Sequence, residues 1–400
     1  MWTSRRGSSK CGSAIALPIR MKILVPLLAL LMGTAGLAQT PQRRDTTTAP
    51  QALLAPKAPQ ASQAPQAPQA QTFSDTVAVQ VMLDRGGFSP GAIDGQPGAN
   101  LKRALAAFQR ANGLIESGVA DDQTRERLGV TASPALTAYQ ISETDVAGPF
   151  TAAIPSDLMA QSKLEKLGYQ NALEAIAERF HASPQLLRRL NTGATFSKAG
   201  EQIQVPNVEP FDSLALAQGK PLDITQPATI APQRGRGRGA EQGAAPAGRG
   251  RRGETDSRGT TGVAEFTIAV TKSTSALTVE DSAGRVVFHA PVTTGSEHDP
   301  LPIGTWKVTT VQVMPKFNYN PDLFWDAKPA QSKATIQPGP NNPVGVAWID
   351  LTKEHYGIHG TPDPANIGHV QSHGCVRLTN WDVARVLKWA QPGTPVVFRE

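Results

Sequence analysis

Residues 355–378 read HYGIHGTPDPANIGHVQSHGCVRL and hold four of the seven histidines of the chain together with Cys375. A cysteine beside histidines is commonly either a nucleophile whose thiol proton an imidazole accepts, or a metal ligand beside imidazole nitrogens. Gly374, directly before the thiol, allows backbone N–H groups to approach an oxyanion. Arg377, two residues after it, is a permanent cation suited to a carboxylate. The pattern therefore favours a cysteine nucleophile.

Two motifs in this stretch, Ile358-His359-Gly360-Thr361 and the SHGCVR sequence of residues 372–377, resemble the signature of the L,D-transpeptidase (YkuD-like) catalytic domain. The resemblance covers residues 263–400 and implies a mainly β fold, either sandwich-like or a curled sheet, in an enzyme of peptidoglycan cross-linking. Local signals agree with strands and one late helix. They are alternating apolar residues in 266–270, a hairpin of 276–280 and 285–289, a strand from 302, an apolar run in 344–351, a capped helix from Thr379 and a last strand in 395–398.

The resemblance assigns roles within this stretch. Cys375 is the expected nucleophile, and His359 is the expected general base. The family implies that the backbone carbonyl of Gly360 orients the imidazole of His359. His373 is expected to shape the site rather than to act as the base, and the N–H groups of Gly374 and Cys375 are expected to form the oxyanion hole.

Two further residues are expected to contact substrate. Arg377 is a candidate for binding a carboxylate of the stem peptide, and Tyr356 is a candidate for lining the cleft. His355 and His369 are expected to be surface or loop histidines. No cofactor is expected.

The implied reaction consists of two acyl transfers. The thiolate attacks the carbonyl of the third stem residue, displaces a terminal D-alanine and leaves a thioester. An amine of a neighbouring stem then forms a 3-3 cross-link. Water as the acceptor gives an L,D-carboxypeptidase instead, and a protein amine attaches a protein to the wall. The sequence leaves the acceptor open.

A reading from another class is a zinc- or wall-binding envelope protein without enzymatic activity. Its metal ligands would be His355, His359, His373 and Cys375, which then have to converge within bonding distance of one ion. The nucleophile interpretation includes no metal.

The formal net charge of +6 does not indicate nucleic-acid binding. Five Lys and Arg residues precede Ala38 and no Asp or Glu does, so removal of residues 1–38 leaves a charge of about +1. The apolar run 23–32 and the small residues before position 38 are typical of a cleaved secretory leader, beginning at Met1 or Met21. The run is too short for a stable membrane span. We therefore expect export to the periplasm or cell wall, where Cys375 is the single remaining thiol.

Composition divides the rest of the chain. Residues 39–73 form an Ala/Pro/Gln-rich linker and residues 210–262 an Arg/Gly-rich linker. Residues 74–130 resemble the small all-α peptidoglycan-binding domain of three helices, with Asn100 as the expected cap of one helix. Residues 136–209 follow a strand–helix–helix–strand order that resembles a small α+β LysM glycan-binding module. His181, at a helix end, is expected to be a capping or surface residue.

The expected fold is therefore multidomain, with peptidoglycan stem peptides as the expected partner. Whether the LysM-like module binds glycan strands is left open, and the sequence gives no indication of an oligomeric state.

Overall fold

The computed structural model describes residues 72–219, 266–370 and 372–400. The expected leader, the Ala/Pro/Gln-rich linker apart from its last two residues, and most of the Arg/Gly-rich linker lie outside these ranges. Among the described residues, no helix combines the length and the apolar character that crossing a membrane requires.

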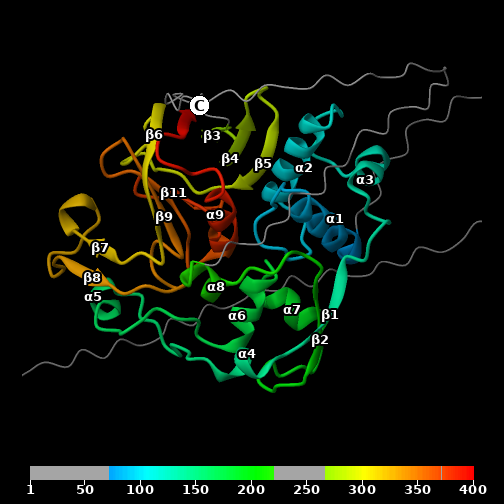
Figure 1. The fold of residues 1–400 in the computed structure, drawn as a ribbon, viewed down its shortest axis with the longest axis horizontal. Coiled ribbons are helices and arrows are strands. Elements are labelled where there is room, and N and C mark those ends of the chain that lie inside the picture. The colour runs from blue at the N-terminus through cyan, green and yellow to red at the C-terminus, as the bar shows by residue number, and fades with distance from the viewer. Residues whose placement is uncertain (1–71, 220–265, 371) are drawn as a thin grey trace, which may run out of the picture. The chain divides into compact units, whose positions relative to one another are not determined.

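The first described module contains three helices, as predicted (Figure 1). They are α1 (Phe73–Arg85), α2 (Ala99–Ala111) and α3 (Asp122–Leu128). The helical spacing of apolar residues in α2 places Leu101, Leu105 and Phe108 in the core. One cap was predicted wrongly: Gly98, not Asn100, is the N-cap of α2. The Asn100 side chain instead donates a hydrogen bond to the carbonyl of Ile367, 2.9 Å away.

Two polar residues of this module that do not fit an apolar core pattern have structural roles. Gln109 is fully buried and donates to Ser117, Thr124 and the Val119 carbonyl, while its carbonyl accepts from the Gly118 N–H. Asp94, likewise, accepts a hydrogen bond from Gln80 at 2.8 Å. The buried and paired amide of Gln109 therefore stabilises its loop, whereas Asp94 is only half-buried and uses Oδ1 for its hydrogen bonds.

The middle module has the predicted strand–helix–helix–strand order. Strands β1 (Leu136–Gln140) and β2 (Gln202–Pro206) pair antiparallel, and helices α6 (Ala172–Arg179) and α7 (Pro184–Leu190) lie between them in sequence. Two short helices, α4 (Glu143–Ala147) and α5 (Leu158–Gln161), occupy the stretch between β1 and α6. The predicted end of the module is residue 209. Helix α8 (Ser213–Ala217) follows, and Phe211 and Leu216 are buried in the core of the C-terminal domain.

The C-terminal domain is built on one eight-stranded sheet, in the order β11-β10-β9-β6-β12-β3-β4-β5. Its strands are β3 (Phe266–Thr271), β4 (Ala276–Asp281), β5 (Val286–Pro291), β6 (Gly304–Val313), β9 (Ala347–Leu351), β10 (Gly357–His359), β11 (Val376–Arg377) and β12 (Pro395–Arg399). The predicted hairpin is the β4–β5 pair. Of the two expected architectures, the curled single sheet is the one observed.

Strand β6 produces much of the curl. Its first residues pair with β12 and its later residues pair with β9, and the register shifts between Val308 and Val311. Such an irregularity bends a strand and increases its twist. A separate two-stranded sheet, β7 (Phe317–Tyr319) and β8 (Ala334–Ile336), lies in the excursion between β6 and β9, with the short 3₁₀ helix η1 (Pro321–Leu323) between its strands. A second 3₁₀ helix, η2 (Pro364–Asn366), lies between β10 and β11.

Helix α9 (Asn380–Val386) follows the SHGCVR motif directly and packs against the sheet at β9 and β10. Thr379 is its N-cap, as predicted, and accepts a hydrogen bond from the Asp382 N–H at 3.2 Å. Trp381, Val383 and Val386 are buried in the domain core. The helix therefore fixes the chain immediately after Cys375.

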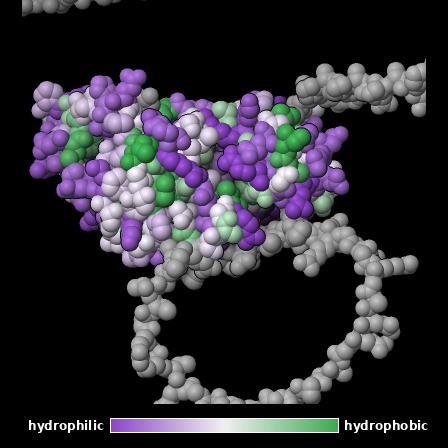
Figure 2. Space-filling model, turned by 90° about the horizontal axis from the view of Figure 1, so that it is seen from above, coloured by the Kyte–Doolittle hydropathy of each residue, from purple (hydrophilic) through white to green (hydrophobic). Residues whose placement is uncertain are grey.

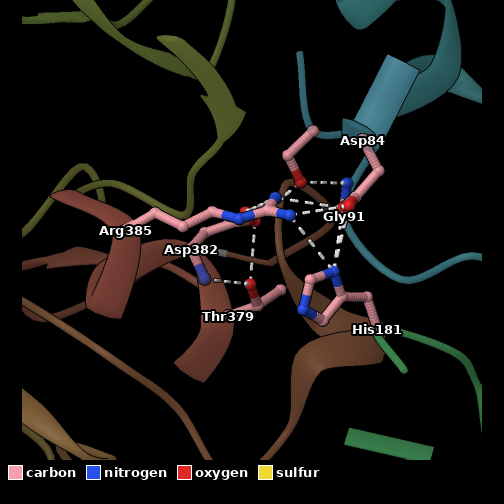
Figure 3. Close-up of polar contacts among 7 residues, drawn as sticks. Asp84, Gly91, His181, Thr379, Asp382 and Arg385 are labelled. Atoms are coloured by element: carbon pink, nitrogen blue, oxygen red, sulfur yellow. Dashed lines mark hydrogen bonds and ion pairs between the residues drawn. The ribbon is translucent and has the colours of Figure 1, made fainter. Parts of the chain in front are cut away.

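Helix α9 also carries charged residues that bind the first two modules (Figure 3). Arg385 makes two hydrogen bonds to Asp84 of α1, at 2.7 and 3.1 Å, and His181 lies 3.0 Å from the same carboxylate. Ser89 donates to Asp382 at 2.8 Å. The expectation of a capping or surface role for His181 is wrong. Its side chain is buried, because Asp84 and Arg385 come from distant parts of the chain to cover it.

The ion pair determines the charge state of Asp84. Burial raises the pKa of this carboxyl. The charge of Arg385 and then that of His181 lower the pKa by more than burial raises it, so the pKa is well below its ordinary value. Burial is the largest influence on Asp382 and raises its pKa to about 7. Asp84 is therefore the permanent anion of the cluster.

Replacement of Asp84 by alanine is expected to destabilise the fold, because Arg385 then loses its main partner inside the protein. Breaking a buried pair costs roughly 3–5 kcal/mol. Asp382, 3.6 Å from Arg385, remains as a weaker partner, so we expect about 3 kcal/mol. Urea unfolding of the purified protein measures this loss in the free energy of unfolding. The matched control is Arg110→Ala, which breaks the exposed pair with Glu116 and should change stability by less than about 0.5 kcal/mol. Equal effects of the two variants contradict the expectation.

Exposed apolar residues of the described part of the chain are scattered. On the face shown in Figure 2, hydrophobic residues form small separate groups among hydrophilic ones. Exposed large apolar side chains, such as Ile115 and Trp325, come from different modules. Scattered apolar residues are normal on a protein surface.

Candidate active site

Parallel pairing of β10 and β11 brings the two sequence motifs together. Ile358 pairs with Val376 and His359 pairs with Arg377. The N–H of Leu378 donates to the His359 carbonyl at 2.8 Å, which extends the contact beyond the strands. Cys375, one residue before β11, is thereby placed beside the start of β10, although many residues separate the motifs in sequence.

The imidazole of His359 is held in one orientation. Its Nδ1 lies 2.7 Å from the carbonyl oxygen of Gly360, and since a carbonyl only accepts, Nδ1 carries the proton. The indole of Trp348 stacks on the ring, with centroids 5.3 Å apart and an interplanar angle of 18°. Nε2 is therefore left with a free lone pair, the form that a general base requires.

His359 is neutral near neutral pH. Burial lowers the pKa of its imidazole most, the nearby charge of Arg377 lowers it further, and the bond to Gly360 opposes them, with a result of about 3. The residue is 3% exposed. Its ring is thus desolvated, uncharged and fixed by its neighbours.

Cys375 is the free cysteine of the described residues and is partly exposed. Its Sγ lies 3.8 Å from the carbonyl of His355, toward which the thiol donates. Burial raises the pKa of the thiol most, while the N–H of Gly357 and the charge of Arg377 lower it, and the pKa remains above its ordinary value. The resting residue is therefore a neutral thiol, and a base is needed to make it a nucleophile.

Gly374 has a backbone conformation that other residues rarely adopt, with φ of +100°. A Cβ at this position would also lie 2.8 Å from Cε1 of Tyr356. Tyr356 thus packs against the backbone next to the nucleophile, and only glycine allows both the turn and this contact. Tyr356 also lines the cleft, as predicted.

Arg377 presents a cation to the same cleft. Its Nε is buried and has no hydrogen-bonding partner among the described parts of the chain. Burial lowers the pKa of its guanidinium, and the neighbouring Cys375 opposes that effect. Because Arg377 is half-buried and its Nε lacks a partner, the position suits an anionic group of a ligand.

His373 lies in the cleft but is engaged elsewhere. Its Nε2 lies 2.9 Å from Oδ1 of Asp326, and its ring packs near Phe324, with centroids 5.1 Å apart. Both partners lie between β7 and β8, within the excursion between β6 and β9. His373 therefore joins the SHGCVR motif to this part of the chain.

The remaining two histidines of the stretch were expected at the surface. His369 is exposed, and the imidazole of His355 is 58% exposed and lies 3.5 Å from Glu354. The backbone of His355, however, belongs to the site, because its carbonyl accepts from Cys375 and its φ is +66°. A backbone contact of this kind has no signature in the sequence.

The cleft around Cys375 has a volume of about 790 Å³. Sequence reasoning missed several of its lining residues. They are Asp299, Trp348 and Asp350 of the C-terminal domain, the excursion residues Phe317, Tyr319, Leu323, Phe324 and Asp326, and Ser156, Asp157 and Leu158 of the middle module. The alternation of β9 could have placed Trp348 and Asp350 on one face. The contribution of the middle module has no local signal.

The geometry gives no support to the zinc alternative. Within the described ranges, no group of three or more His, Cys, Asp or Glu side chains is arranged to hold a metal ion. Two of the four residues proposed as zinc ligands already use a ring nitrogen for a hydrogen bond. Nδ1 of His359 binds the carbonyl of Gly360, and Nε2 of His373 binds Asp326.

Comparison with known families identifies two regions of the chain. Residues 265–398 match the model of the YkuD family, described as the L,D-transpeptidase catalytic domain. Residues 74–128 match a family described as "Putative peptidoglycan binding domain".

Curated relatives are similar over part of the C-terminal domain. The chain is 47% identical over 60 residues to "Putative L,D-transpeptidase YkuD" of Bacillus licheniformis, which is 15% of this chain and 36% of the relative. It is 40% identical over 65 residues to "Probable L,D-transpeptidase YbiS" of Escherichia coli K12, 16% of this chain and 21% of that protein. The chain therefore spans only about a third of the length of the first relative and about a fifth of the length of the second.

Solved structures are similar over a comparable region. An L,D-transpeptidase from Mycobacterium smegmatis matches 34% of this chain and 59% of its own, with 19% identity and a TM-score of 0.29. L,D-transpeptidase 3 of Mycobacterium tuberculosis, in complex with a faropenem-derived adduct, matches 34% of this chain and 60% of its own, with 17% identity and a TM-score of 0.28.

Proposed function

We propose that the protein, whose residues 265–398 match the YkuD family of L,D-transpeptidase catalytic domains, transfers acyl groups between peptidoglycan stem peptides through Cys375. The observation that carries the proposal is the fixed imidazole of His359. The carbonyl of Gly360 holds its proton on Nδ1, and Nε2 is left unprotonated in the cleft that contains Cys375. A cysteine, a correctly oriented base and a third group that orients the base are the parts of a nucleophilic acyl-transfer site.

The first half-reaction forms a thioester. Nε2 of His359 accepts the thiol proton as Sγ of Cys375 attacks the carbonyl carbon of the third stem residue. The carbonyl π electrons move to oxygen, and the N–H groups of Gly374 and Cys375 stabilise that oxyanion. When the tetrahedral intermediate collapses, the C–N bond to the terminal D-alanine breaks, and His359 donates its proton to the leaving amine.

The second half-reaction repeats these steps with an amine acceptor. His359 removes a proton from the amine of a neighbouring stem as its nitrogen attacks the thioester carbonyl. Collapse breaks the C–S bond, and the proton returns to the thiolate of Cys375. The product is a 3-3 cross-link, and the enzyme is restored without a cofactor.

Charge in the cleft fits such a substrate. Arg377 presents a half-buried guanidinium that suits a stem carboxylate. Asp299 and Asp350 line the same cleft and suit the protonated amine of an approaching acceptor. The peptidoglycan-binding domain matched at residues 74–128 supports the wall polymer as the partner.

The test is mass spectrometry of the products formed from tetrapeptide-stem muropeptides. Loss of D-alanine together with a cross-linked dimer is the expected result. Loss of D-alanine with only a tripeptide product would replace the proposal with L,D-carboxypeptidase activity. Recovery of substrate without any acyl-enzyme would contradict the proposed function itself.

Two further proposals concern the rest of the chain. Export to the periplasm or cell wall rests on the apolar run 23–32, and amino-terminal sequencing of the protein recovered from cells tests it.

The LysM-like character of the middle module is supported by a cavity of about 550 Å³ between the start of α6 and the loop 191–197. Titration with a soluble glycan chain tests it, and heat signals no larger than buffer dilution would contradict glycan binding.

A further inference from the structure

Asn380, the first residue of α9, is fully buried and uses its whole side-chain amide. Its Nδ2 donates to Oε1 and Oε2 of Glu178, at 3.2 and 3.1 Å, and to the carbonyl of Pro340 at 3.0 Å. Its Oδ1 accepts from the N–H of Val346 at 3.2 Å. These bonds fix which end of the amide faces which neighbour, with the oxygen toward β9.

The oxygen of Asn380 lies between two glycine backbones. A Cβ on Gly345 or on Gly360 would overlap Oδ1 of Asn380. Gly345 adopts a positive φ of 62°. Such close approach of backbone to a side chain requires glycine, so the side chain of Asn380 and the backbone of Gly360 restrict each other's position.

Gly360 is the residue that orients the catalytic base. Its carbonyl accepts the Nδ1 proton of His359 at 2.7 Å, and its own N–H lies 3.3 Å from the carbonyl of Ala347. A shift of Asn380 therefore moves Gly360, and with it the imidazole. A misplacement of about 1 Å can cost about 10²-fold in rate.

The other end of the amide is held by the middle module. Glu178 lies in α6 and is buried. Tyr169 of the same module donates to its Oε1 at 2.9 Å. Burial is the largest influence on Glu178 and raises the pKa of its carboxyl to about 8, so the group accepts hydrogen bonds without a buried charge near neutral pH.

We propose that Glu178 and Asn380 are positioning residues for His359, so that the middle module completes the catalytic unit rather than only binding or spacing. Glu178 contacts Asn380, and Asn380 contacts the backbone of Gly360. The carbonyl of Gly360 then accepts the Nδ1 proton of His359. This inference rests on the proposed function of Cys375 and His359 and adds a role for a module outside the matched catalytic domain.

The test compares Glu178→Ala with wild type in single-turnover acylation by a donor stem. We expect the acylation rate constant near pH 7 to fall by ~10-fold while the concentration for half-saturation stays within about twofold. The loss should shrink at high pH, where the thiol ionises without the base. Glu178→Gln keeps an acceptor for Asn380 and should restore the rate to within about threefold of wild type.

Glu174 provides a matched control on the same helix. Its Oε1 accepts from Nδ2 of Asn341 at 2.7 Å, so Glu174→Ala breaks a contact between the same module and the same domain. The hydrogen bonds of Asn341 within the described residues go to Leu167, Gly168 and Glu174, so the variant should acylate like wild type with an unchanged pH profile. Equal losses in Glu174→Ala and Glu178→Ala would overturn the proposal, because they would indicate general loosening of the interface.

Tyr169→Phe covers the case in which Glu178→Ala does not fold. It removes the hydroxyl that binds both Glu178 and Ser213, and a loss of about two- to fivefold with the same dependence on pH is expected. A folded Glu178→Ala, or failing that a folded Tyr169→Phe, with the wild-type rate and pH profile would overturn the proposal.

Histidine nitrogen NMR separates failure of this inference from failure of the proposed function. The Nδ1–H signal of His359, assigned by its absence in His359→Ala, should be protected from exchange in wild type and lose protection in Glu178→Ala. This signal does not require turnover. If wild type forms no acyl-enzyme, the proposed function fails, and the NMR comparison still decides the positioning. If Cys375 acylates but the signal is the same in both proteins, only the positioning proposal fails.

Discussion

Replacement of Cys375 by alanine should abolish acyl-enzyme formation, with a loss of at least about 10³-fold in the rate of D-alanine release. The physical reason is that the thioester needs a sulfur atom, and the sequence contains only one cysteine besides Cys11. The other groups of the site, including the proposed oxyanion donors, can polarise a carbonyl but cannot form the covalent intermediate. Intact-protein mass after incubation with a donor stem or a carbapenem measures the acylation.

The fold should survive this substitution. Sγ makes a long hydrogen bond to the carbonyl of His355 and interacts with the N–H of Gly357, and the residue is partly exposed. The urea midpoint of Cys375→Ala should therefore stay close to that of wild type. A folded variant with residual turnover within tenfold of wild type would show that Cys375 is not the nucleophile.

Loss of the imidazole of His359 should give the second largest effect. Burial raises the pKa of the thiol of Cys375, so even less thiolate is present near neutral pH than the few per cent of a free cysteine. Without a base, His359→Ala should acylate roughly 10²–10⁴-fold more slowly at pH 7. Part of the loss should return at high pH, since the folded thiol ionises there unaided.

The wild-type enzyme should behave differently as the pH falls. Burial depresses the pKa of His359 to about 3, below the ordinary value of 6.5, so its base form persists well below neutrality. The sign for stability follows from the same shift. The unfolded chain binds a proton at this residue from pH 6.5 downward while the folded chain does not, so this contribution to stability is complete above pH 6.5. It is lost progressively as the pH falls toward 3.

His373→Ala is the matched comparison for the base. His373 binds Asp326 and packs near Phe324, so its loss should act through the geometry of the β7–β8 excursion. High pH should not restore its activity. The measurement is the acylation rate of both variants across pH. Recovery of the His373 variant alone at high pH would reverse the two assignments.

Local sequence signals predicted the elements of the fold well. The spacing of apolar residues agrees with the buried face of α2. The predicted hairpin of 276–280 and 285–289 is the β4–β5 pair, and Thr379 correctly predicted the start of α9. These features depend on interactions within a few residues, and such interactions are written in the spacing of residue types. The same holds for the candidate nucleophile, because the SHGCVR motif is contiguous.

Errors arose where a residue's neighbours come from far along the chain. His181 was expected at the surface because only its helix end was visible, and Asn100 was expected to cap a helix because it precedes an apolar pattern. In the structure, Asp84 and Arg385 bury the first, and the carbonyl of Ile367 binds the second. No local pattern identifies such partners.

The sequence alone predicted the proposed class of chemistry, through its resemblance to a family, together with the motif that carries it and most of the helices and strands around it. The stacking of the Trp348 indole on His359 and the lining of the cleft by residues 156–158 became visible only in the tertiary structure. It also placed Glu178 against Asn380. The physical reason is that hydrogen bonds, ion pairs and burial depend on distance in space, whereas a sequence records distance along the chain.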